Sequence, residues 1–287
     1  MTSHYPRISA TIQLLLVVAL IPISNAITEL EILEIFYGKT EGYKWKNNTN
    51  WVGGSDAYCN WHGVSCNSEE EVKKLELSEN NMGGTFASEI YLLPKLEELN
   101  FKDDDGMTFT FDGIVKADNL KRLILQDAGI TSIEGIGEAP SLSYVDISRN
   151  GELLKGNIPS EIYDMTSLRT LFLDRNAFTG NISPDIGLLT NLEYMDFFGN
   201  SLDGKIPTEV GKLTSLKDMG LAGNNLEGTI PSQIVSLNML SGLFLHMNSF
   251  TGRIPRLKTQ PDLKSVYLSD NFFHGKYGQL HCFVWYA

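Results

Sequence analysis

Residues 192–207 read Leu-Glu-Tyr-Met-Asp-Phe-Phe-Gly-Asn-Ser-Leu-Asp-Gly-Lys-Ile-Pro, an instance of the pattern L-x-x-L-x-L-x-x-N-x-L-x-G-x-I-P. The pattern recurs with its asparagine every 24 residues, at Asn176, Asn200, Asn224 and Asn248. A fixed period of this length indicates stacked units, because one such unit cannot bury its own apolar residues. The period therefore predicts an α/β repeat solenoid.

Each part of the repeat has a physical role. Leu171 and Leu173 alternate with Thr170, Phe172 and Asp174, so both leucines are expected to point inward from a short strand. The amide of Asn176 can accept from one backbone N–H and donate to a carbonyl, so stacked asparagines would satisfy buried backbone after each strand. Ile182 and Ile186 are expected to close the core from the convex side.

The repeats run over residues 72–280 as about nine turns, of which two are irregular. Within residues 96–141 the first leucines are kept, but Asp104 and Ala128 stand at the asparagine position. The alanine side chain cannot form the amide hydrogen bonds. We therefore predict that residues 96–141 are the loosest part of the array.

Residues 27–71 are predicted to form a cap over the first repeat. Thr28 and Glu31 have capping-box spacing at the start of a helical pattern. Trp45, Trp51 and Trp61 follow among Asn, Gly and Ser residues. A ligand cage is the alternative reading of these aromatics, but a cap must bury something large, so cap core is favoured.

Residues 1–26 have the pattern of a secretory signal peptide. Arg7 provides a basic start, an apolar run extends from Leu14 to Ile21, and Ser24-Asn25-Ala26 offers a cleavage site. The run is too short to span a bilayer, and no later segment of spanning length follows. The mature chain is expected to be soluble and extracellular, at the cell surface or wall. Residues 281–287 are assigned as a tail or incomplete C-terminal cap.

The cysteines and sequons fit that compartment. Cys59 and Cys66 are close in sequence, and an oxidising route favours a disulfide, whereas no matching Cys or His pair supports a metal site. Cys282 is either buried and inert or one half of a pair. Asn47 and Asn181 head Asn-x-Ser/Thr triplets and are predicted glycosylation sites.

The charge excludes some partners. Without residues 1–26 the chain has 22 basic and 35 acidic residues, a net charge of −13. Residues 27–113 hold 17 of the acidic and 7 of the basic residues. This balance argues against nucleic acid, anionic lipid and anionic polysaccharide as main partners.

The Gly-x-Ile-Pro repeats and the Cys-x-Trp-x-Gly-Val-x-Cys cap together resemble plant-type extracellular leucine-rich-repeat proteins, over about residues 27–280. The resemblance implies a right-handed horseshoe with a parallel β-sheet on the concave face and an N-terminal helical cap. Members include receptor-kinase ectodomains, receptor-like proteins without kinases, and secreted inhibitors of pectin-cleaving enzymes. This chain departs from the family in residues 96–141 and at the C-terminus, and it contains no kinase domain.

Residues that flank the inward leucines should face the concave side. An outward band of aromatics is a binding-site signal, and aromatics edged by charged residues suit a protein or peptide. Packing between neighbouring strands is the competing interpretation. The candidate binding residues are Tyr144, Arg149, Phe172, Arg175, Tyr194, Phe198, Phe244, His246, Met247 and Tyr267. The small residues Gly220, Ala222, Gly223 and Gly242 are expected to leave a shallow trough between two aromatic clusters.

The sequence supports a catalytic function less well than a binding function. Asp146, Asp174 and Asp196 form a column, but Arg149 and Arg175 are expected to neutralise it as surface ion pairs. No nucleophile–base pair, phosphate loop, metal set or cofactor motif is present, so no catalytic site, metal or cofactor is predicted.

The sequence therefore favours a secreted or cell-surface module that binds an extracellular protein or peptide through its concave face. A membrane co-receptor is a further candidate partner. The alternative is a structural protein of the extracellular matrix or cell wall that binds polysaccharide, and a cell-wall glycan is the less favoured ligand.

Overall fold

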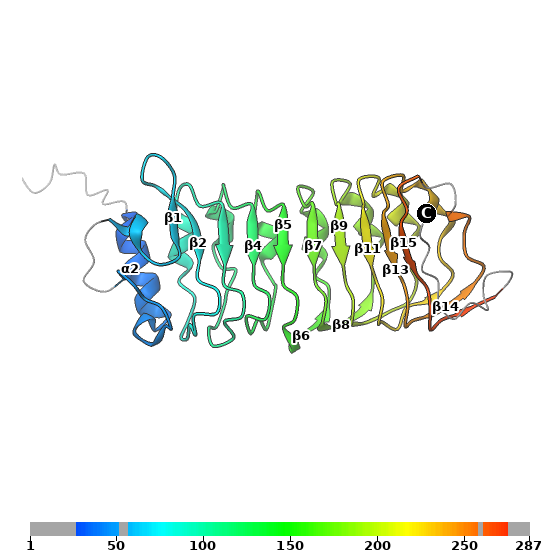
Figure 1. Ribbon diagram of the computed structural model, residues 1–287, viewed down its shortest axis with the longest axis horizontal. Helices are drawn as coiled ribbons and strands as arrows, with labels where there is room; N and C mark the ends of the chain where they lie inside the picture. The colour runs from blue at the N-terminus through cyan, green and yellow to red at the C-terminus, as the bar shows by residue number, and fades with distance from the viewer. Residues whose placement is uncertain (1–26, 52–56, 258–260, 275–287) are drawn as a thin grey trace, which may run out of the picture.

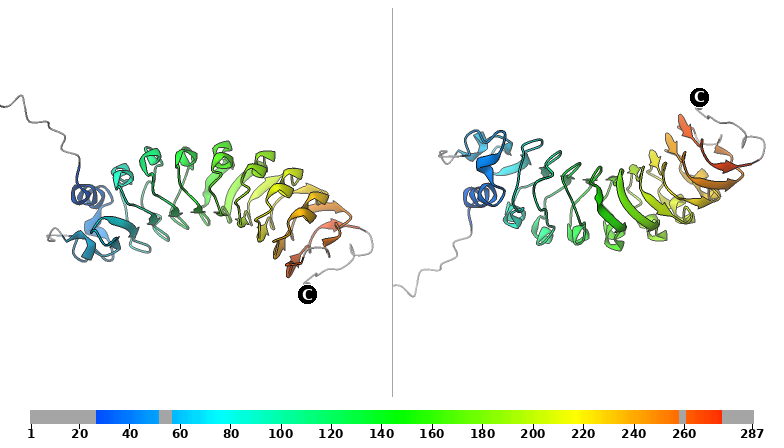
Figure 2. Two further views of the ribbon diagram at one scale, coloured as in Figure 1. Left: turned by 90° about the horizontal axis from the view of Figure 1, so that it is seen from above. Right: turned by 90° about the horizontal axis from the view of Figure 1, so that it is seen from below.

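The computed structural model describes residues 27–51, 57–257 and 261–274. The chain winds into an elongated solenoid, with one strand of a long sheet per turn and short helical segments on the opposite side (Figure 1). Seen from above and below, the solenoid curves with the long sheet on its inner side (Figure 2). The predicted horseshoe with a concave parallel sheet is confirmed.

The concave sheet has ten strands within the described residues, and all neighbours are parallel except the first pair. In spatial order its strands are β1 (Val64–Cys66), β2 (Val72–Glu76), β3 (Glu98–Asn100), β4 (Arg122–Ile124), β5 (Tyr144–Asp146), β7 (Thr170–Phe172), β9 (Tyr194–Asp196), β11 (Asp218–Gly220), β13 (Gly242–Phe244) and β15 (Ser265–Tyr267).

A second row of strands runs along one flank. It comprises one sheet of β6 (Gly151–Asn157), β8 (Asn176–Asn181) and β10 (Ser201–Asp203), and another of β12 (Glu227–Gly228), β14 (Ser249–Gly252) and β16 (Phe272–Phe273). The convex side carries 3₁₀ segments: η4 (Ser88–Leu92), η5 (Ile114–Lys116), η6 (Ile136–Glu138), η7 (Ser160–Asp164), η8 (Pro184–Leu188), η9 (Thr208–Lys212) and η10 (Ser232–Ser236).

The core is a set of side-chain rows that run the length of the solenoid. Strand register places Leu75 beside Leu99 and Leu99 beside Leu123, and all three are fully buried. Burying such a side chain stabilises the fold by about 1.5–3 kcal/mol. Each row is shared between adjacent turns, so a turn gains most of its stability from its neighbours.

The asparagine ladder forms as predicted. Asn176 accepts a hydrogen bond from the backbone N–H of Asn150 through Oδ1 and donates through Nδ2 to the carbonyls of Ile147 and Leu173. Asn200 repeats the carbonyl contacts one turn later, with Leu173 and Phe197. Each amide therefore links two turns while satisfying buried backbone.

The ladder changes within residues 96–141. Asp104 keeps the acceptor role, because its carboxylate accepts from the N–H groups of Asn80 and Met82 at 2.9 and 2.8 Å. Ala128 is buried and supplies no such acceptor. One rung of the ladder is therefore missing.

The cap has the predicted helix and aromatic core. Helix α2 (Glu29–Lys39) begins with the Thr28–Glu31 capping box, and η2 (Gly42–Lys44) and η3 (Tyr58–Asn60) follow. Trp45 and Trp51 are buried with ring centroids 4.9 Å apart, and the indole N–H of Trp45 donates to the Thr40 carbonyl. The aromatics therefore pack as cap core.

The disulfide between Cys59 and Cys66 is present in the cap. No helix among the described residues combines the length and apolarity needed to cross a membrane. The predicted signal segment 1–26 and the tail 281–287, with Cys282, lie outside the described residues.

Candidate ligand-binding face

Two rows of the concave sheet carry half of the candidate residues. One row runs Tyr144, Thr170, Tyr194, Asp218, Gly242 and Ser265 along successive strands. The next runs Asp146, Phe172, Asp196, Gly220, Phe244 and Tyr267. Register therefore gathers five candidate or acidic residues from the strands β5, β7 and β9, and further aromatics from β13 and β15.

The aromatics make two groups. Tyr144 and Phe172 meet edge to face, with ring centroids 6.0 Å apart. In the second group Phe244 stacks on Tyr267 at 5.4 Å, and the His246 ring lies 6.0 Å from that tyrosine. These rings are half-buried or exposed, and Tyr267 keeps 37% of its surface exposed. The face therefore presents apolar area to solvent after its internal contacts are made.

The prediction of a shallow trough between the two groups is wrong. The ring centroids of Phe198 and His246 are 6.3 Å apart, and Ala222, in the turn between them, is only 1% exposed. A Cβ built on Gly242 would lie 2.7 Å from the Phe244 ring, and one on Gly220 would lie 2.4 Å from a carboxylate oxygen of Asp196. These positions are small because neighbouring side chains occupy the space above them.

Cations lie over several of the rings. The Arg122 guanidinium is 3.9 Å from the centroid of the Tyr144 ring, and the ammonium of Lys217 is 5.5 Å from that of Tyr194. Arg175 is 5.6 Å from the Phe198 ring. Such contacts stabilise the face by about 0.5–1 kcal/mol each at exposed sites. They show that part of the aromatic band serves the sheet itself.

Ion pairs connect neighbouring turns in the N-terminal half of the concave face. Glu97 bridges Lys73 and Lys121 at 3.3 and 3.2 Å. One strand position along, Glu98 bridges Lys74 and Arg122 at 3.1 and 3.4 Å.

Glu193 repeats the arrangement further along, with Arg169 and Lys217 at 2.7 and 2.6 Å. Sequence reasoning missed these pairs. The signal was there, because Lys73, Glu97 and Lys121 alternate in sign at the repeat spacing of 24 residues.

The aspartates behave differently, and the predicted ion-pair ladder with Arg149 and Arg175 is wrong. Within the described chain neither arginine forms an ion pair with a carboxylate. Burial, together with the charges of Asp196 and Asp146, raises the pKa of Asp174 to about 6. The column is thus a set of carboxylates without ion pairs among the described residues, although the charge of Arg175 partly opposes the rise in pKa.

Two neighbouring aspartates share this behaviour. Burial also raises the pKa of Asp196, against the opposing effects of the Phe198 N–H and the Arg175 charge. The pKa of Asp218 is likewise raised by burial. The C-terminal half of the face therefore combines exposed aromatic area with carboxylates whose ionised form is destabilised by burial.

Arg149, Arg175 and Met247 lie just beyond the strands, at the residue before each ladder asparagine. All three have a left-handed backbone, with φ of 61°, 54° and 56°. Non-glycine residues adopt this conformation rarely, and here the bend is fixed by the ladder hydrogen bonds. Their side chains are exposed along one edge of the concave face.

Both predicted glycosylation positions are exposed. Asn47 lies in the cap, where its Oδ1 accepts hydrogen bonds from the N–H and hydroxyl of Thr49. Asn181 ends β8 on the flank of the solenoid. Neither residue belongs to the concave sheet.

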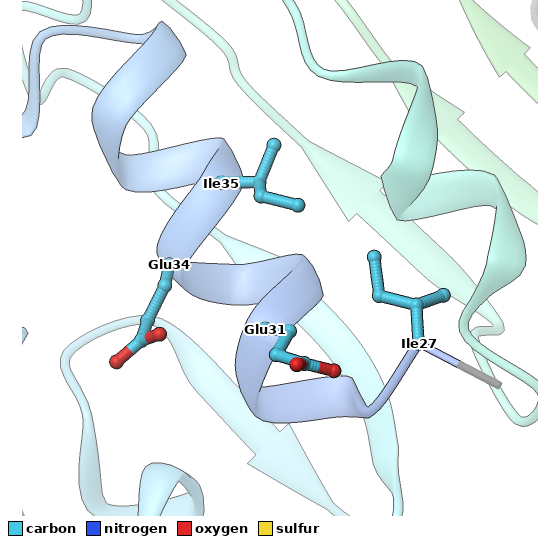
Figure 3. Close-up of a pocket in the computed structure, with 4 residues that line it drawn as sticks. All are labelled: Ile27, Glu31, Glu34 and Ile35. Atoms are coloured by element: carbon cyan, nitrogen blue, oxygen red, sulfur yellow. The ribbon is translucent and has the colours of Figure 1, made fainter. Parts of the chain in front are cut away.

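A pocket of about 450 Å³ lies at the cap, away from this face. Ile27 and Ile35 point toward the same space beside α2, with Glu31 and Glu34 at its border (Figure 3). Glu31 is already engaged by Thr28 in the capping box, so the two carboxylates do not form a free acid–base pair. The described residues contain no group of three side chains placed to hold a metal ion.

Comparisons with known proteins agree with the fold. The Leucine Rich Repeat family model matches residues 191–213. MDIS1-interacting receptor like kinase 1 of Arabidopsis thaliana is 32% identical over 111 residues, which are 39% of this chain and 11% of that protein. The Arabidopsis receptor kinase HAESA, solved in complex with the peptide hormone IDA and the co-receptor SERK1, is 25% identical with a TM-score of 0.64.

The HAESA match covers 84% of this chain and 46% of that chain. A plant ice-binding protein superimposes with a TM-score of 0.66 at 20% identity, covering 86% of this chain and 87% of that one. At that identity the likeness extends to the fold alone, and one fold serves unrelated functions.

The repeat, the architecture and these likenesses together define a leucine-rich-repeat solenoid. The chain is similar to the ectodomains of plant leucine-rich-repeat receptor kinases, and it spans 11% of the curated receptor kinase and 46% of the HAESA chain.

Proposed function

We propose that this chain is a secreted or cell-surface recognition module that binds a peptide or protein through the C-terminal half of its concave face. The site comprises the aromatic band Tyr144, Phe172, Tyr194, Phe198, Phe244, His246 and Tyr267, with Arg149, Arg175 and Met247 along its edge. In this role the chain is receptor-like or inhibitor-like and non-catalytic.

One contrast within the sheet carries the proposal. In the N-terminal half, Glu97 and Glu98 are each paired with two cations, so that surface is internally satisfied. In the C-terminal half Glu193 pairs with Arg169 and Lys217, but aromatic rings remain partly exposed beside Asp174, Asp196 and Asp218, which form no ion pair within the described chain. Exposed aromatic area with charged neighbours is the composition of protein-binding hot spots.

The size of the face suits an extended ligand. Five strand spacings separate Tyr144 from Tyr267, or about 24 Å, which accommodates roughly seven extended residues. HAESA, a protein of similar fold, binds a peptide hormone and a co-receptor. We therefore propose an extracellular peptide or protein as ligand, with a membrane co-receptor as a further partner.

The alternative is a structural protein of the cell wall that binds polysaccharide. Its natural surface would be the regular flank formed by β6, β8 and β10. A glycan at Asn181, which is exposed at the end of β8, would cover that flank and leave the concave face open. This position favours recognition through the concave face.

A paired pull-down from the extracellular fluid of the producing tissue tests the proposal. The baits are the secreted chain, its Phe172→Ala/Tyr194→Ala/Phe244→Ala variant, and a control with three exposed flank residues replaced, Thr179→Ala/Ser201→Ala/Thr251→Ala. All three are matched for folding by circular dichroism. We expect mass spectrometry to find a protein or peptide that only the concave-face variant loses.

Equal capture by all three baits would reject the concave face as the site. The baits could instead retain only cell-wall polymer in moderate salt, equally with and without the concave-face substitutions. That result would favour the structural role.

A further inference from the structure

The flank of the solenoid has a break in its hydrogen bonding. From β6 onward, neighbouring turns pair along this flank, and Asn225 and Glu227 donate backbone N–H groups to the carbonyls of Leu202 and Gly204 between β10 and β12. On the N-terminal side Thr85 pairs with Thr108. Among the described residues nothing continues the ladder between Thr108 and β6. Strand β6, at the lower edge of Figure 1, is therefore a sheet edge inside the array.

The break contains a pocket of about 340 Å³, which we name the flank gap. Residues 131–134 line one side, and Leu154, Lys155 and Asn157 of β6 line the other. Within the described chain no backbone hydrogen bond joins the two sides. The backbone N–H and C=O groups on the two sides of the flank gap therefore do not hydrogen-bond to each other.

Side chains hold the gap at both ends. At one end, the Asn150 Oδ1 atom accepts from the N–H groups of Ala128 and Ile130 at 3.0 and 2.9 Å. At the other, the Glu161 Oε1 atom accepts from the Gly135 N–H at 3.1 Å. Because these anchors are buried or half-buried, the opening between them is part of the fold.

The floor of the gap is apolar. Phe178, Leu154 and Ile133 line it, and each is at least 98% buried. The rim is charged, with Glu134 and Lys155 exposed and in no ion pair among the described residues. A pocket of this size, with an apolar floor and a few polar groups, is within the range of ligand sites.

The register of β6 makes this edge unusual. Its pairing with β8 jumps from Gly151 to Lys155, so the intervening residues bulge out of the ladder. Bulges and charges commonly protect a sheet edge from other strands. Here the bulge instead leaves Leu153 with 55% of its surface exposed, which adds apolar area beside the gap.

These features identify the occupant. Unpaired backbone at a strand edge is complementary to another backbone, and an apolar floor below it accepts a side chain of the added strand. Among the residues that line the gap, Glu134 and Glu161 carry carboxylates and Lys155 is the one cation. We propose that the flank gap is a second binding site, which takes an extended peptide of another protein by strand addition, with an apolar side chain over Phe178 and a basic neighbour facing the rim.

Selection from a phage-displayed library of random linear peptides, on the immobilised full-length secreted chain, supplies the probe. One enriched peptide is synthesised, and its Kd is measured by calorimetry on four proteins. These are the wild type, Thr131→Trp, which fills the gap from its exposed rim, Ser201→Trp, a matched exposed change on β10, and the concave-face triple alanine variant.

We expect Thr131→Trp to weaken binding at least about tenfold, while Ser201→Trp and the concave-face variant bind like the wild type. Amide hydrogen exchange in residues 131–133 and 154–156 should slow when the peptide is bound. Because the concave-face variant is included, a failure here is distinct from a failure of the proposed function.

Three results would overturn the proposal. The selection could yield no peptide that the gap-filling variant loses. The bound peptide could leave exchange at both sides of the gap unchanged. Light scattering could show that Thr131→Trp abolishes a dimer of this chain, which would make the occupant a second copy.

Discussion

The rings of Phe198 and His246 lie 6.3 Å apart although their strands are separated by a complete turn. Two strand spacings amount to about 9.5 Å, so both side chains lean over the turn between them. Ala222 lies in that turn and is 1% exposed. A small residue at this position therefore stands between two rings that approach each other across it.

Replacing Ala222 with leucine should separate Phe198 from His246. The added side chain has no space, so we expect a loss of about 1–3 kcal/mol of unfolding free energy. Urea denaturation of Ala222→Leu against wild type measures it. Ala222→Ser, which adds one atom, is the control and should cost less. Equal stability of the leucine variant would contradict the packing described.

Ala128→Asn should restore the missing rung of the ladder. The new amide can accept from the backbone N–H groups of Asp104 and Gly106, as Asn150 does one turn later. At about 0.5–1.5 kcal/mol per hydrogen bond, the variant should be more stable than the wild type.

Amide exchange gives the local readout for this change. In the wild type, residues 96–141 should exchange faster than residues 168–257, and Ala128→Asn should reduce the difference. Ala128→Ser, which lacks the amide, is the matched control. Uniform protection across both regions of the wild type would contradict the prediction.

Stability should depend on pH through Asp174. Its folded pKa of about 6 lies above the ordinary value of 3.8, so the folded state binds the proton more tightly. Stability is therefore lost as pH rises from about 4 to 6, and the full cost is present above that range.

Asp174→Asn removes this titration. The variant should be more stable than wild type at pH 7.5 and nearly equal near pH 4, in thermal melts. Asp203→Asn, an exposed change on β10, is the control. A carboxyl titration of Asp174 by NMR with its midpoint at an ordinary value would refute the shift.

The Cys59–Cys66 disulfide closes a loop with a sequence separation of 7 in the cap. Replacing both cysteines by serine should lower the unfolding free energy by about 2.5 kcal/mol in the chain-entropy model. Denaturation with and without reductant measures the change. Reductant should destabilise the wild type and leave the double variant unaffected, and a wild type insensitive to reductant would contradict it.

The repeat made much of the fold predictable from sequence. Leu171 and Asn176 stand in the same positions of every regular turn, so the period assigns one residue to the core and the other to the ladder. The capping box of Thr28 and Glu31 was predictable for a similar reason, because its hydrogen bonds are local. The ion pairs of Glu97 could also have been predicted, because Lys73 and Lys121 carry the opposite charge one repeat before and one repeat after it.

The repeat alone assigns the side chains that face inward, because inward positions recur with the period and burial follows the strand alternation. The contacts of the outward side chains emerge only once the turns are stacked. Arg175 lies by the Phe198 ring instead of pairing with Asp174, and Phe198 crosses Ala222 to reach His246. The physical reason is that such contacts join different turns, so they depend on register, side-chain rotamers and the curvature of the sheet, none of which the 24-residue period encodes.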